Sequence, residues 1–221
     1  MIFSKVIKNE ILNGKFHRLE FAAQNRGFKF CPGQFVILKV PGGVFRDYSI
    51  ASLPETLPCW EMIVDVSPDG PGCQYLKNLK PGAKVETSLP TGTFVLNPGF
   101  ENYLLGATGS GVASILPLAW ELSVLKKRIF FYWGLRFSED ICLENKVKSL
   151  GGEIILSRPD KNWTGKTGHV TEYMAGLVKT LPPAKTCSYL CGNKNMLADV
   201  KAILKKARLP GKQIFFENYF L

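Results

Sequence analysis

The sequence predicts two domains of different fold class: an antiparallel β domain over residues 1–98, then an α/β domain with a parallel sheet over residues 99–221. Three observations lead to this prediction. The length of 221 residues suits one large or two small domains. The first part alternates apolar and polar residues with the two-residue period of half-buried strands. The second part alternates short apolar runs with segments of helical length.

The composition describes a folded chain with a basic surface. Hydrophobic residues make up 46% and charged residues 21%, which supplies a core and excludes disorder. Residues 1–98 carry 11 basic and 8 acidic side chains, a charge of +3, and residues 99–221 carry 17 and 10, a charge of +7, which sum to +10. Nucleic acid, an acidic protein or a polyphosphate would each suit this charge. Because the chain has no nucleic-acid recognition motif, we do not expect nucleic acid as a partner.

The cysteines and the apolar runs exclude further classes. Six cysteines are present, but none form CxxC and no four have the spacing of a plant-type iron–sulfur site, so we expect no metal or cluster in this chain. The longest apolar stretch, residues 112–125, contains Pro117 and Glu121, and we therefore expect no membrane insertion. The N-terminus lacks the long apolar core of a secretory signal, which favours a cytoplasmic location.

The β domain is predicted from short runs separated by Gly and Pro. In CWEMIVDVS, Trp60, Met62, Val64 and Val66 alternate with Glu61, Ile63 and Asp65. KFHRLEFAA and GQFVILKV have the same pattern, and one helical segment, CQYLKNLK, interrupts the series. Many short strands with turn signals between them are typical of a barrel or sandwich.

The α/β domain is predicted from alternating strands and helices. The expected strands are NYLLGAT, RIFFYWGL, GEIILS, TCSYLCG and QIFFEN. The expected helices between them are GVASILPLAWELSVL, SEDICLENKVKSL, VTEYMAGLVKTL and NKNMLADVKAILKKA. Strands that are apolar throughout indicate a parallel sheet covered on both faces.

Residues 45–52, FRDYSIAS, carry the first chemical signal. If they form a strand, Arg46 and Tyr48 share one face and Ser49 points to the other. A guanidinium beside an aromatic ring would bind a flat, negatively charged ligand. An ordinary edge strand would carry the same residues.

Two turns of the α/β domain carry the second signal. Glycines 106, 109 and 111 in GATGSGVAS let a ligand approach the backbone, and the next helix would offer free N–H groups to a phosphate. An ordinary tight turn would have similar glycines. Cys191 ends the fourth strand of this domain, where parallel sheets bind ligands, although a buried structural thiol is equally compatible. The chain has two histidines, and neither lies in a pattern that indicates a hydrolytic triad.

Eight motifs in order give the chain a resemblance to a known family. They are FRDYSIAS, DGPGCQYLKNLKPG, LPTGTF, GATGSGVAS, YWGLR, SRPDKNWTGKTGHV, YLCGNKNM and FENYF. Together they resemble the ferredoxin–NADP reductase superfamily over essentially the whole chain. The resemblance implies a Greek-key, FAD-binding β-barrel at 1–98 and a Rossmann-like, nicotinamide-binding α/β domain at 99–221.

The resemblance implies roles for residues of the first domain. Arg46 would pair with the flavin pyrophosphate, Tyr48 would lie against the isoalloxazine ring, and Ser49 would hydrogen-bond near its N5. The helix N-terminus would hold the pyrophosphate, and Thr91 and Gly92 would flank the flavin. The segment at that helix contains Gly70, Gly72, Cys73 and Gln74, with Cys73 in place of the family's usual serine.

The resemblance also implies roles in the second domain. The nicotinamide turn would contain Gly106, Thr108, Gly109 and Gly111, with Ser114 in place of the family's usual proline. The family's CGxxxM segment would be Cys191, Gly192 and Met196. The adenosine end would be bound by Arg136, Ser157 and Arg158. Glu217 and Tyr219 would approach the flavin, and the residues nearest the reacting atoms would be Ser49, Cys191 and Glu217.

The implied function is an FAD-dependent oxidoreductase that passes hydride from NADPH or NADH to flavin N5. The electrons would leave to an acidic carrier, which would be a ferredoxin, a flavodoxin or an oxygenase component. Reduction of free flavin, or service as the flavin-bearing subunit of a larger complex, are the alternatives. Arg158, Lys161 and Arg136 favour NADPH only slightly over NADH.

Overall fold

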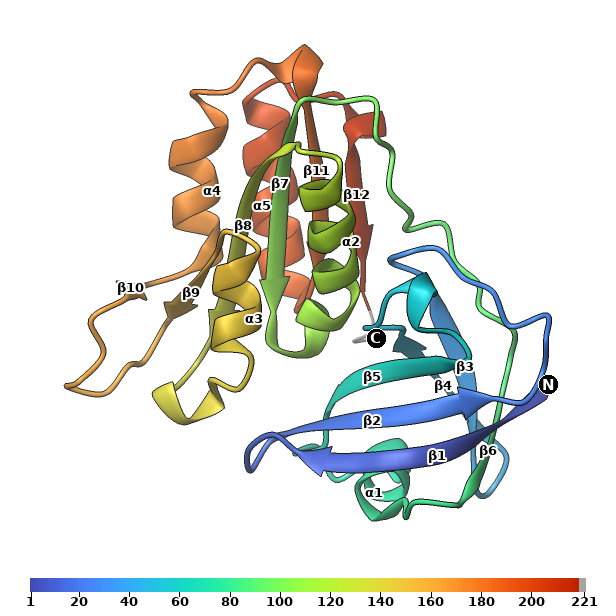
Figure 1. Ribbon diagram of the computed structural model, residues 1–221. Coiled ribbons are helices and arrows are strands. Elements are labelled where there is room, and N and C mark those ends of the chain that lie inside the picture. Colours follow the sequence, from blue (N-terminus) through green and yellow to red (C-terminus); the bar gives the residue numbers. More distant parts are fainter. Residues whose placement is uncertain (219–221) are drawn as a thin grey trace. The chain divides into compact units, whose positions relative to one another are not determined.

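A computed structural model describes residues 1–218 of the chain. Its internal contacts divide the chain into two compact units, Met1–Leu96 and Asn97–Leu221. The division falls two residues before the predicted one, after residue 98. Figure 1 shows the strands of the first unit and the alternating strands and helices of the second. No helix within residues 1–218 has both the length and the apolar character that crossing a membrane requires.

The first unit is a six-stranded antiparallel half-barrel, which confirms the predicted fold class. Its strands are β1 (Ile2–Ile11), β2 (Phe16–Ala23), β3 (Phe35–Val40), β4 (Val44–Ser49), β5 (Cys59–Asp65) and β6 (Lys84–Thr87). They are ordered β4-β3-β6-β1-β2-β5. The last strand in sequence therefore lies between β3 and β1, a crossover of Greek-key type.

The core of this unit follows the period of the strands. Trp60, Met62 and Val64 on β5 are all buried, as the alternation in CWEMIVDVS predicts, but Ile63 between them is buried as well. Phe21 stacks on Trp60 with 4.4 Å between ring centroids. Such aromatic pairs contribute about 1 kcal/mol beyond the area that they bury.

Helix α1 (Pro71–Asn78) begins two residues earlier than the predicted CQYLKNLK. Pro71 occupies the first helical position, where its missing N–H costs nothing. Lys80 precedes Pro81, and a residue before proline disfavours the helical region, so the helix stops short of it. The amide Nδ2 of Asn9, on β1, donates to the carbonyls of Leu76 and Leu79 at 2.9 and 3.0 Å. These bonds satisfy carbonyl groups at the C-terminal end of α1.

The second unit is a parallel α/β sheet, again as predicted. Its strands are β7 (Asn102–Thr108), β8 (Arg128–Leu135), β9 (Gly152–Leu156), β10 (Lys166–Thr167), β11 (Thr186–Cys191) and β12 (Ile214–Glu217). Its helices are α2 (Val112–Val124), α3 (Glu144–Ser149), α4 (Val170–Val178) and α5 (Lys194–Lys206). In Figure 1, α2 and α3 cover one face of the sheet, and α4 and α5 cover the other.

The strand order β10-β9-β8-β7-β11-β12 creates a switch point. The chain runs outward from β7 through β8 and β9, then returns to β11 on the other side of β7. The carboxyl ends of β7 and β11 therefore lie next to each other, with connections leaving in opposite directions. Such switch points are where open parallel sheets bind ligands.

Two elements of the second unit differ most from the prediction. The predicted helix over residues 138–150 is wrong in its first half, because only Glu144–Ser149 form a helix. The Asp140 carboxylate accepts the Phe137 N–H at 3.1 Å, which closes a separate 3₁₀ turn at Ser138–Asp140. Strand β10 was not predicted, since two polar residues carry no periodicity.

Candidate functional site

Strand β4 places Arg46, Tyr48 and Ser49 as the alternation of a strand predicts. Arg46 and Tyr48 share a face, opposite Leu38 and Val36 of β3. Arg46 is exposed and Tyr48 is half-buried. Ser49 is 9% exposed and lies at the end of the strand, on the opposite face from Arg46 and Tyr48.

The N-terminus of α1 lies against the same two side chains. A Cβ atom added to Gly72 would meet the Tyr48 hydroxyl oxygen at 2.6 Å and Cγ of Arg46 at 3.3 Å. Gly72 is the second residue of α1, and Gly70 is its N-cap. The fold thus brings Arg46, Tyr48 and a helix N-terminus together from segments that are more than twenty residues apart in sequence.

The electrostatics of this cluster keep its phenol neutral. Burial raises the pKa of Tyr48 to about 12, with a further rise from Cys73, while the Arg46 guanidinium opposes the shift. Burial and the nearby Asp65 also raise the pKa of the Cys73 thiol, again against Arg46. At neutral pH, Arg46 is therefore the charged group of the cluster, because both of its neighbours stay protonated.

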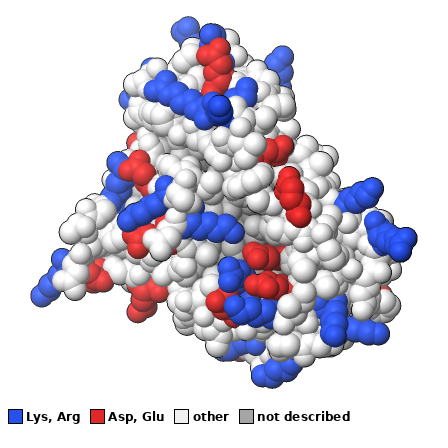
Figure 2. Space-filling model, viewed as in Figure 1, with Lys and Arg blue, Asp and Glu red and all other residues white. Residues whose placement is uncertain are grey.

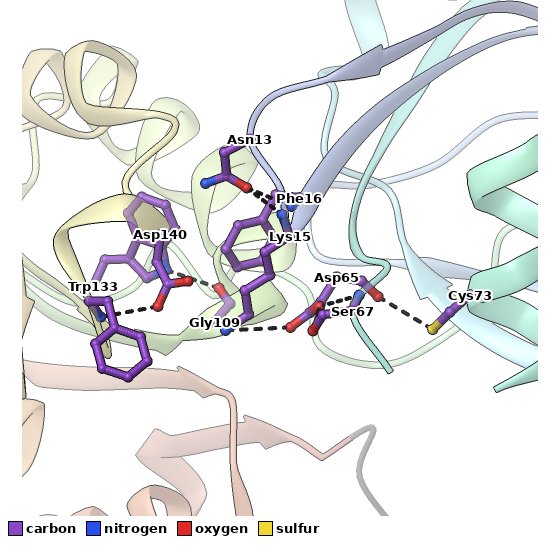
Figure 3. A network of polar contacts seen from close by, with 10 residues as sticks. Asn13, Lys15, Phe16, Asp65, Ser67, Cys73, Gly109, Trp133 and Asp140 are labelled. Carbon is purple, nitrogen blue, oxygen red and sulfur yellow. Dashed lines mark hydrogen bonds and ion pairs between the residues drawn. The ribbon is translucent and has the colours of Figure 1, made fainter. Parts of the chain in front are cut away.

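Asp65 holds the approach to this helix in place (Figure 3). Its backbone carbonyl accepts the Cys73 thiol at 3.4 Å, and its Oδ1 accepts the Ser67 hydroxyl at 2.6 Å. Lys15 lies 3.7 Å from its Oδ2. One residue further along α1, Gln74 Nε2 donates to Asp69 Oδ1 at 2.5 Å. These contacts order the loop that precedes α1.

Thr91 and Gly92 reach the same end of β3. The backbone groups of Thr91 and Phe35 exchange two hydrogen bonds of 2.9 and 3.0 Å, and Phe35 in turn pairs with Ser49. Gln34 Nε2 donates to the Gly92 carbonyl at 3.2 Å. Gly92 has φ of 106°, a value that favours glycine. Ser49, Phe35 and Thr91 therefore lie in one row across the sheet.

These residues fit FAD. The helix N-terminus and the guanidinium suit a pyrophosphate, and the Tyr48 ring supplies a flat apolar face for an isoalloxazine. Glycine at position 72 allows the N-terminus of α1 to pack against Tyr48, since any side chain there would occupy the space that Tyr48 fills.

In the second unit, the glycine-rich turn after β7 touches the turn after β11. A Cβ atom at Gly111 would collide with the carbonyl group of Cys191. A Cβ atom at Gly192 would collide with the Thr108 hydroxyl. Gly109 has φ of 55° and begins a 3₁₀ turn that leads into α2. Only glycines allow the two turns to pack this closely at the switch point.

Thr108 and Asn193 join these two turns. The Thr108 hydroxyl accepts the backbone N–H and the side-chain amide of Asn193 at 2.9 and 3.1 Å. Asn193 Oδ1 accepts the Met196 N–H at 2.9 Å and so caps α5. The sequence analysis missed Asn193, although an Asn before a helical run is a known N-cap signal.

Cys191 is 1% exposed and lies in register with Ala107 on β7 and Glu217 on β12. Burial raises the pKa of its thiol to about 12, and Glu217 adds to this while Ser114 opposes it. The thiol therefore stays protonated at neutral pH. This state does not favour a nucleophilic role for Cys191, because a nucleophile requires the thiolate.

Two predicted residues of this region have clear packing roles. Gly106 lies inside β7, and a Cβ atom there would be 3.0 Å from Leu190 and 3.1 Å from the sulfur of Met174. Met196 is 5% exposed, and its methyl group lies beside Gly192. Glycine at 106 therefore lets α4 approach the sheet.

Arg136, Ser157 and Arg158 extend β8 and β9 beyond their ends. The Arg158 N–H donates to the Arg136 carbonyl at 2.8 Å, and the Ser157 N–H donates to Leu135 at 3.1 Å. Both arginines are exposed. The fold thus places the backbones of two exposed arginines side by side at the carboxyl edge of the sheet. The prediction for Tyr219 lies outside the described residues.

Trp133 is a further site residue that the sequence analysis did not single out. Its indole Nε1 donates to the Gly109 carbonyl at 2.9 Å (Figure 3), which ties the glycine-rich turn to β8. Trp133 is fully buried. A buried tryptophan must satisfy its N–H, and that requirement was the available signal.

Comparisons with known proteins agree with this geometry. The profile of the "Oxidoreductase FAD-binding domain" matches residues 4–96, and that of the "Oxidoreductase NAD-binding domain" matches residues 105–202. The chain is 31% identical over 215 residues to ferredoxin–NADP reductase B of Sorangium cellulosum (strain So ce56), covering 89% of this chain and 88% of that protein.

Two further similarities cover most of the chain. It is 29% identical over 206 residues to ferredoxin–NAD(P)(+) reductase CarAd of Metapseudomonas resinovorans, covering 86% of this chain and 61% of that longer protein. A crystal structure of a ferredoxin NADP+ reductase from Neisseria gonorrhoeae with bound FAD and NADP superposes with a TM-score of 0.86. It is 20% identical and covers 99% of this chain and 98% of that chain.

Fold and sequence together define an oxidoreductase with one FAD-binding and one NAD(P)-binding domain. The chain belongs to the ferredoxin–NADP reductase superfamily.

Proposed function

We propose that this protein accepts a hydride from NAD(P)H on a bound FAD and passes the electrons to a separate carrier. The observation that carries the proposal is the contact of Gly72 with both Arg46 and Tyr48. It supports a site with a phosphate-binding helix end, a cation and an aromatic ring, which is the set of groups that FAD requires. When bound, FAD supplies the two-electron acceptor that no amino-acid side chain provides.

Residues of the first unit bind and orient the cofactor. Arg46 neutralises the pyrophosphate together with the N–H groups at Gly72 and Cys73. Tyr48 offers its ring face, and its raised pKa keeps the phenol uncharged beside the flavin. Ser49 directs a hydroxyl donor from the end of β4 toward the reacting edge of the ring.

Residues of the second unit position the nicotinamide. Thr108 and Asn193 hold the turns at the ends of β7 and β11 together. Gly111 and Gly192 let these two turns pack against each other. Cys191 contributes a neutral thiol, and Glu217 lies opposite it on β12. Their task is positioning, which is worth several orders of magnitude in rate for a bimolecular transfer.

Arg136 and Arg158 favour NADPH over NADH as the donor. Their adjacent backbones place two guanidinium groups at the edge of the sheet where the adenosine end would lie. A 2′-phosphate forms charge-assisted hydrogen bonds with such groups, whereas a 2′-hydroxyl gains little from a second cation. Comparing kcat/KM for NADPH and NADH tests this preference.

An acidic electron carrier suits the charge of the chain. The net charge is +10, and Figure 2 shows Lys and Arg side chains spread over the visible face with Asp and Glu among them. Positive charge speeds the encounter with a negatively charged partner. We propose a ferredoxin, a flavodoxin or an oxygenase component, in keeping with the relatives named for ferredoxin reduction.

An anaerobic titration tests the proposal. Purified protein is expected to be yellow, to keep its colour through gel filtration, and to bleach on addition of one equivalent of NADPH or NADH. A colourless protein that oxidises neither nucleotide would contradict the proposal. Colour that is lost on gel filtration, with turnover restored by added flavin, would instead support a reductase of free flavin. A flavin that is reduced only by a protein partner would support an electron-transfer subunit.

A further inference from the structure

The second unit begins with a residue that two buried tyrosines hold. Tyr189 Oη accepts the backbone N–H of Asn97 at 2.7 Å. Tyr103 Oη donates to the backbone carbonyl of Asn97 at 2.7 Å. Asn97 is the first residue after the division between the two units. Both polar groups of its backbone are therefore bonded to side chains of the second unit.

The two phenols are themselves rigid. Tyr103 on β7 and Tyr189 on β11 are both 0% exposed, and β7 and β11 are paired neighbours in the sheet. The Tyr189 ring stacks on Phe215 at a centroid distance of 4.8 Å and an interplanar angle of 8°. The Tyr103 ring packs edge-on against Phe100 at 6.5 Å. The hydroxyl positions are consequently fixed by packing, not by the bonds to Asn97 alone.

Residues 97–100 close into a small ordered loop around these hydroxyls. Tyr103 Oη also accepts the Phe100 N–H at 3.1 Å, and Asn97 Oδ1 accepts the Gly99 N–H at 3.1 Å. Lys127 Nζ donates to the Phe100 carbonyl at 2.9 Å. Burial raises the pKa of both phenols, so both stay protonated and keep these bonds at physiological pH.

We propose that Tyr103 and Tyr189 are positioning residues for hydride transfer, acting through Asn97. Hydride transfer between two domains requires the nicotinamide to reach the flavin in one orientation. Any freedom of the chain at residues 97–100 would be freedom of the whole NAD(P)-binding domain. The tyrosine pair ties Asn97 to the second unit, so that residues 97–100 do not act as a flexible linker in front of that domain. This inference rests on the proposed hydride transfer.

Phenylalanine substitutions isolate the hydroxyl groups. Tyr103→Phe and Tyr189→Phe keep the ring packing and remove the bonds to Asn97. Tyr173→Phe is the matched control, because Tyr173 Oη also donates to a backbone carbonyl of the same unit, that of Thr167, at 2.9 Å. Each variant is compared with wild type for amide hydrogen exchange, nucleotide affinity, flavin reduction rate and the long-wavelength absorbance of a stacked nicotinamide–flavin pair.

The expected result is a separation of rate from affinity. In Tyr103→Phe and Tyr189→Phe the amides of Asn97, Gly99 and Phe100 should exchange about tenfold faster, since a buried partner is lost. Flavin reduction should slow about fivefold with weaker stacking absorbance, because fewer encounters are productive. FAD content and the dissociation constant for NADP⁺ should stay within about twofold of wild type, as neither site is touched.

Two outcomes overturn the inference. Reduction rates and stacking absorbance equal to those of Tyr173→Phe would mean that the pair has a structural role only. Unchanged exchange at residues 97–100 would mean that the hydroxyls do not hold the loop. Failure of the proposed function would be seen in the wild-type protein, which would then show no flavin reduction by NADPH or NADH. In that case the inference would also be wrong, because it rests on hydride transfer.

Discussion

Gly72 lies directly against Tyr48, because a Cβ atom at residue 72 would stand 2.6 Å from the phenol oxygen. Gly72→Ala should therefore displace the Tyr48 ring or the first turn of α1. Because both belong to the proposed FAD site, we expect FAD affinity to fall about tenfold or more. Fluorescence titration of apoprotein with FAD measures it.

Gly14→Ala is the control for that substitution. No atom lies within 4 Å of a Cβ placed at Gly14, which is in the same unit. FAD affinity should be unchanged in this variant. Equal affinity in Gly72→Ala and wild type would show that α1 and Tyr48 do not form the cofactor cradle.

Arg46→Ala should weaken FAD retention. The side chain is exposed, and its Nη1 donates to the backbone carbonyl of the neighbouring residue, Phe45, at 2.8 Å. The protein fold should therefore tolerate its loss, whereas one charge-assisted bond to the pyrophosphate would disappear. That loss corresponds to about tenfold in affinity. Equilibrium dialysis with Arg26→Ala as an exposed control in the same unit tests it, and equal retention in both would remove Arg46 from the site.

Ser49→Ala should slow the chemical step more than it weakens binding. Ser49 is buried at the end of β4, in line with Phe35 and Thr91. Its hydroxyl is proposed to bond near the reacting edge of the flavin, so its loss should lower the rate of flavin reduction about tenfold with FAD content retained. Anaerobic stopped-flow absorbance measures the rate. Loss of FAD with an unchanged rate per bound flavin would assign Ser49 to binding instead.

Arg158→Ala should change the choice of nucleotide. If Arg158 binds the 2′-phosphate, KM for NADPH should rise about tenfold while KM for NADH changes by less than about twofold. Steady-state kinetics with both donors measures the ratio. Lys179→Ala, a substitution on an exposed lysine that follows α4, is the control. An equal rise in both KM values would place Arg158 at a part common to both nucleotides.

His17 should make the first unit less stable in acid. It is 5% exposed, its Nδ1 lies 2.9 Å from Asn9 Oδ1, and burial together with Lys77 lowers its pKa below the ordinary 6.5. As the pH falls through 6.5, the unfolded chain therefore binds a proton before the folded chain does. Stability should drop from that pH down to the folded pKa.

His17→Gln removes the titrating group and should flatten this part of the profile. Urea unfolding between pH 5 and about 8 measures it. His169→Gln, which replaces an exposed imidazole in the second unit, is the control. A slope that survives in His17→Gln would assign the acid sensitivity to the carboxylates.

The elements that the sequence predicted best are the strands buried on both faces. β7 and β8 have the predicted bounds, Asn102–Thr108 and Arg128–Leu135. A short, continuously apolar run between two turns is typical of a strand buried in a parallel sheet. The helix over residues 138–150 failed, since its first turn is closed by Asp140, a polar contact that periodicity does not register. β10 was not predicted, because its two polar residues form no hydrophobic pattern.

For the candidate site, the sequence supplied the residues and the tertiary structure supplied their partners. Arg46, Tyr48 and the glycines were found from local pattern and resemblance, because strand alternation and glycine-rich turns are local properties. The contacts of Trp133 with Gly109 and of Asn193 with Thr108 join residues that are 24 and 85 positions apart.

The sequence by itself therefore determined the two fold classes, and it supplied most of the residues that we propose for the cofactor sites. Only the tertiary structure decided the strand order in space, the contact of Gly72 with Tyr48, and the hold of Tyr103 and Tyr189 on Asn97. The physical reason is that periodicity reports which face of an element is buried. Which distant group occupies that face is settled when the elements pack.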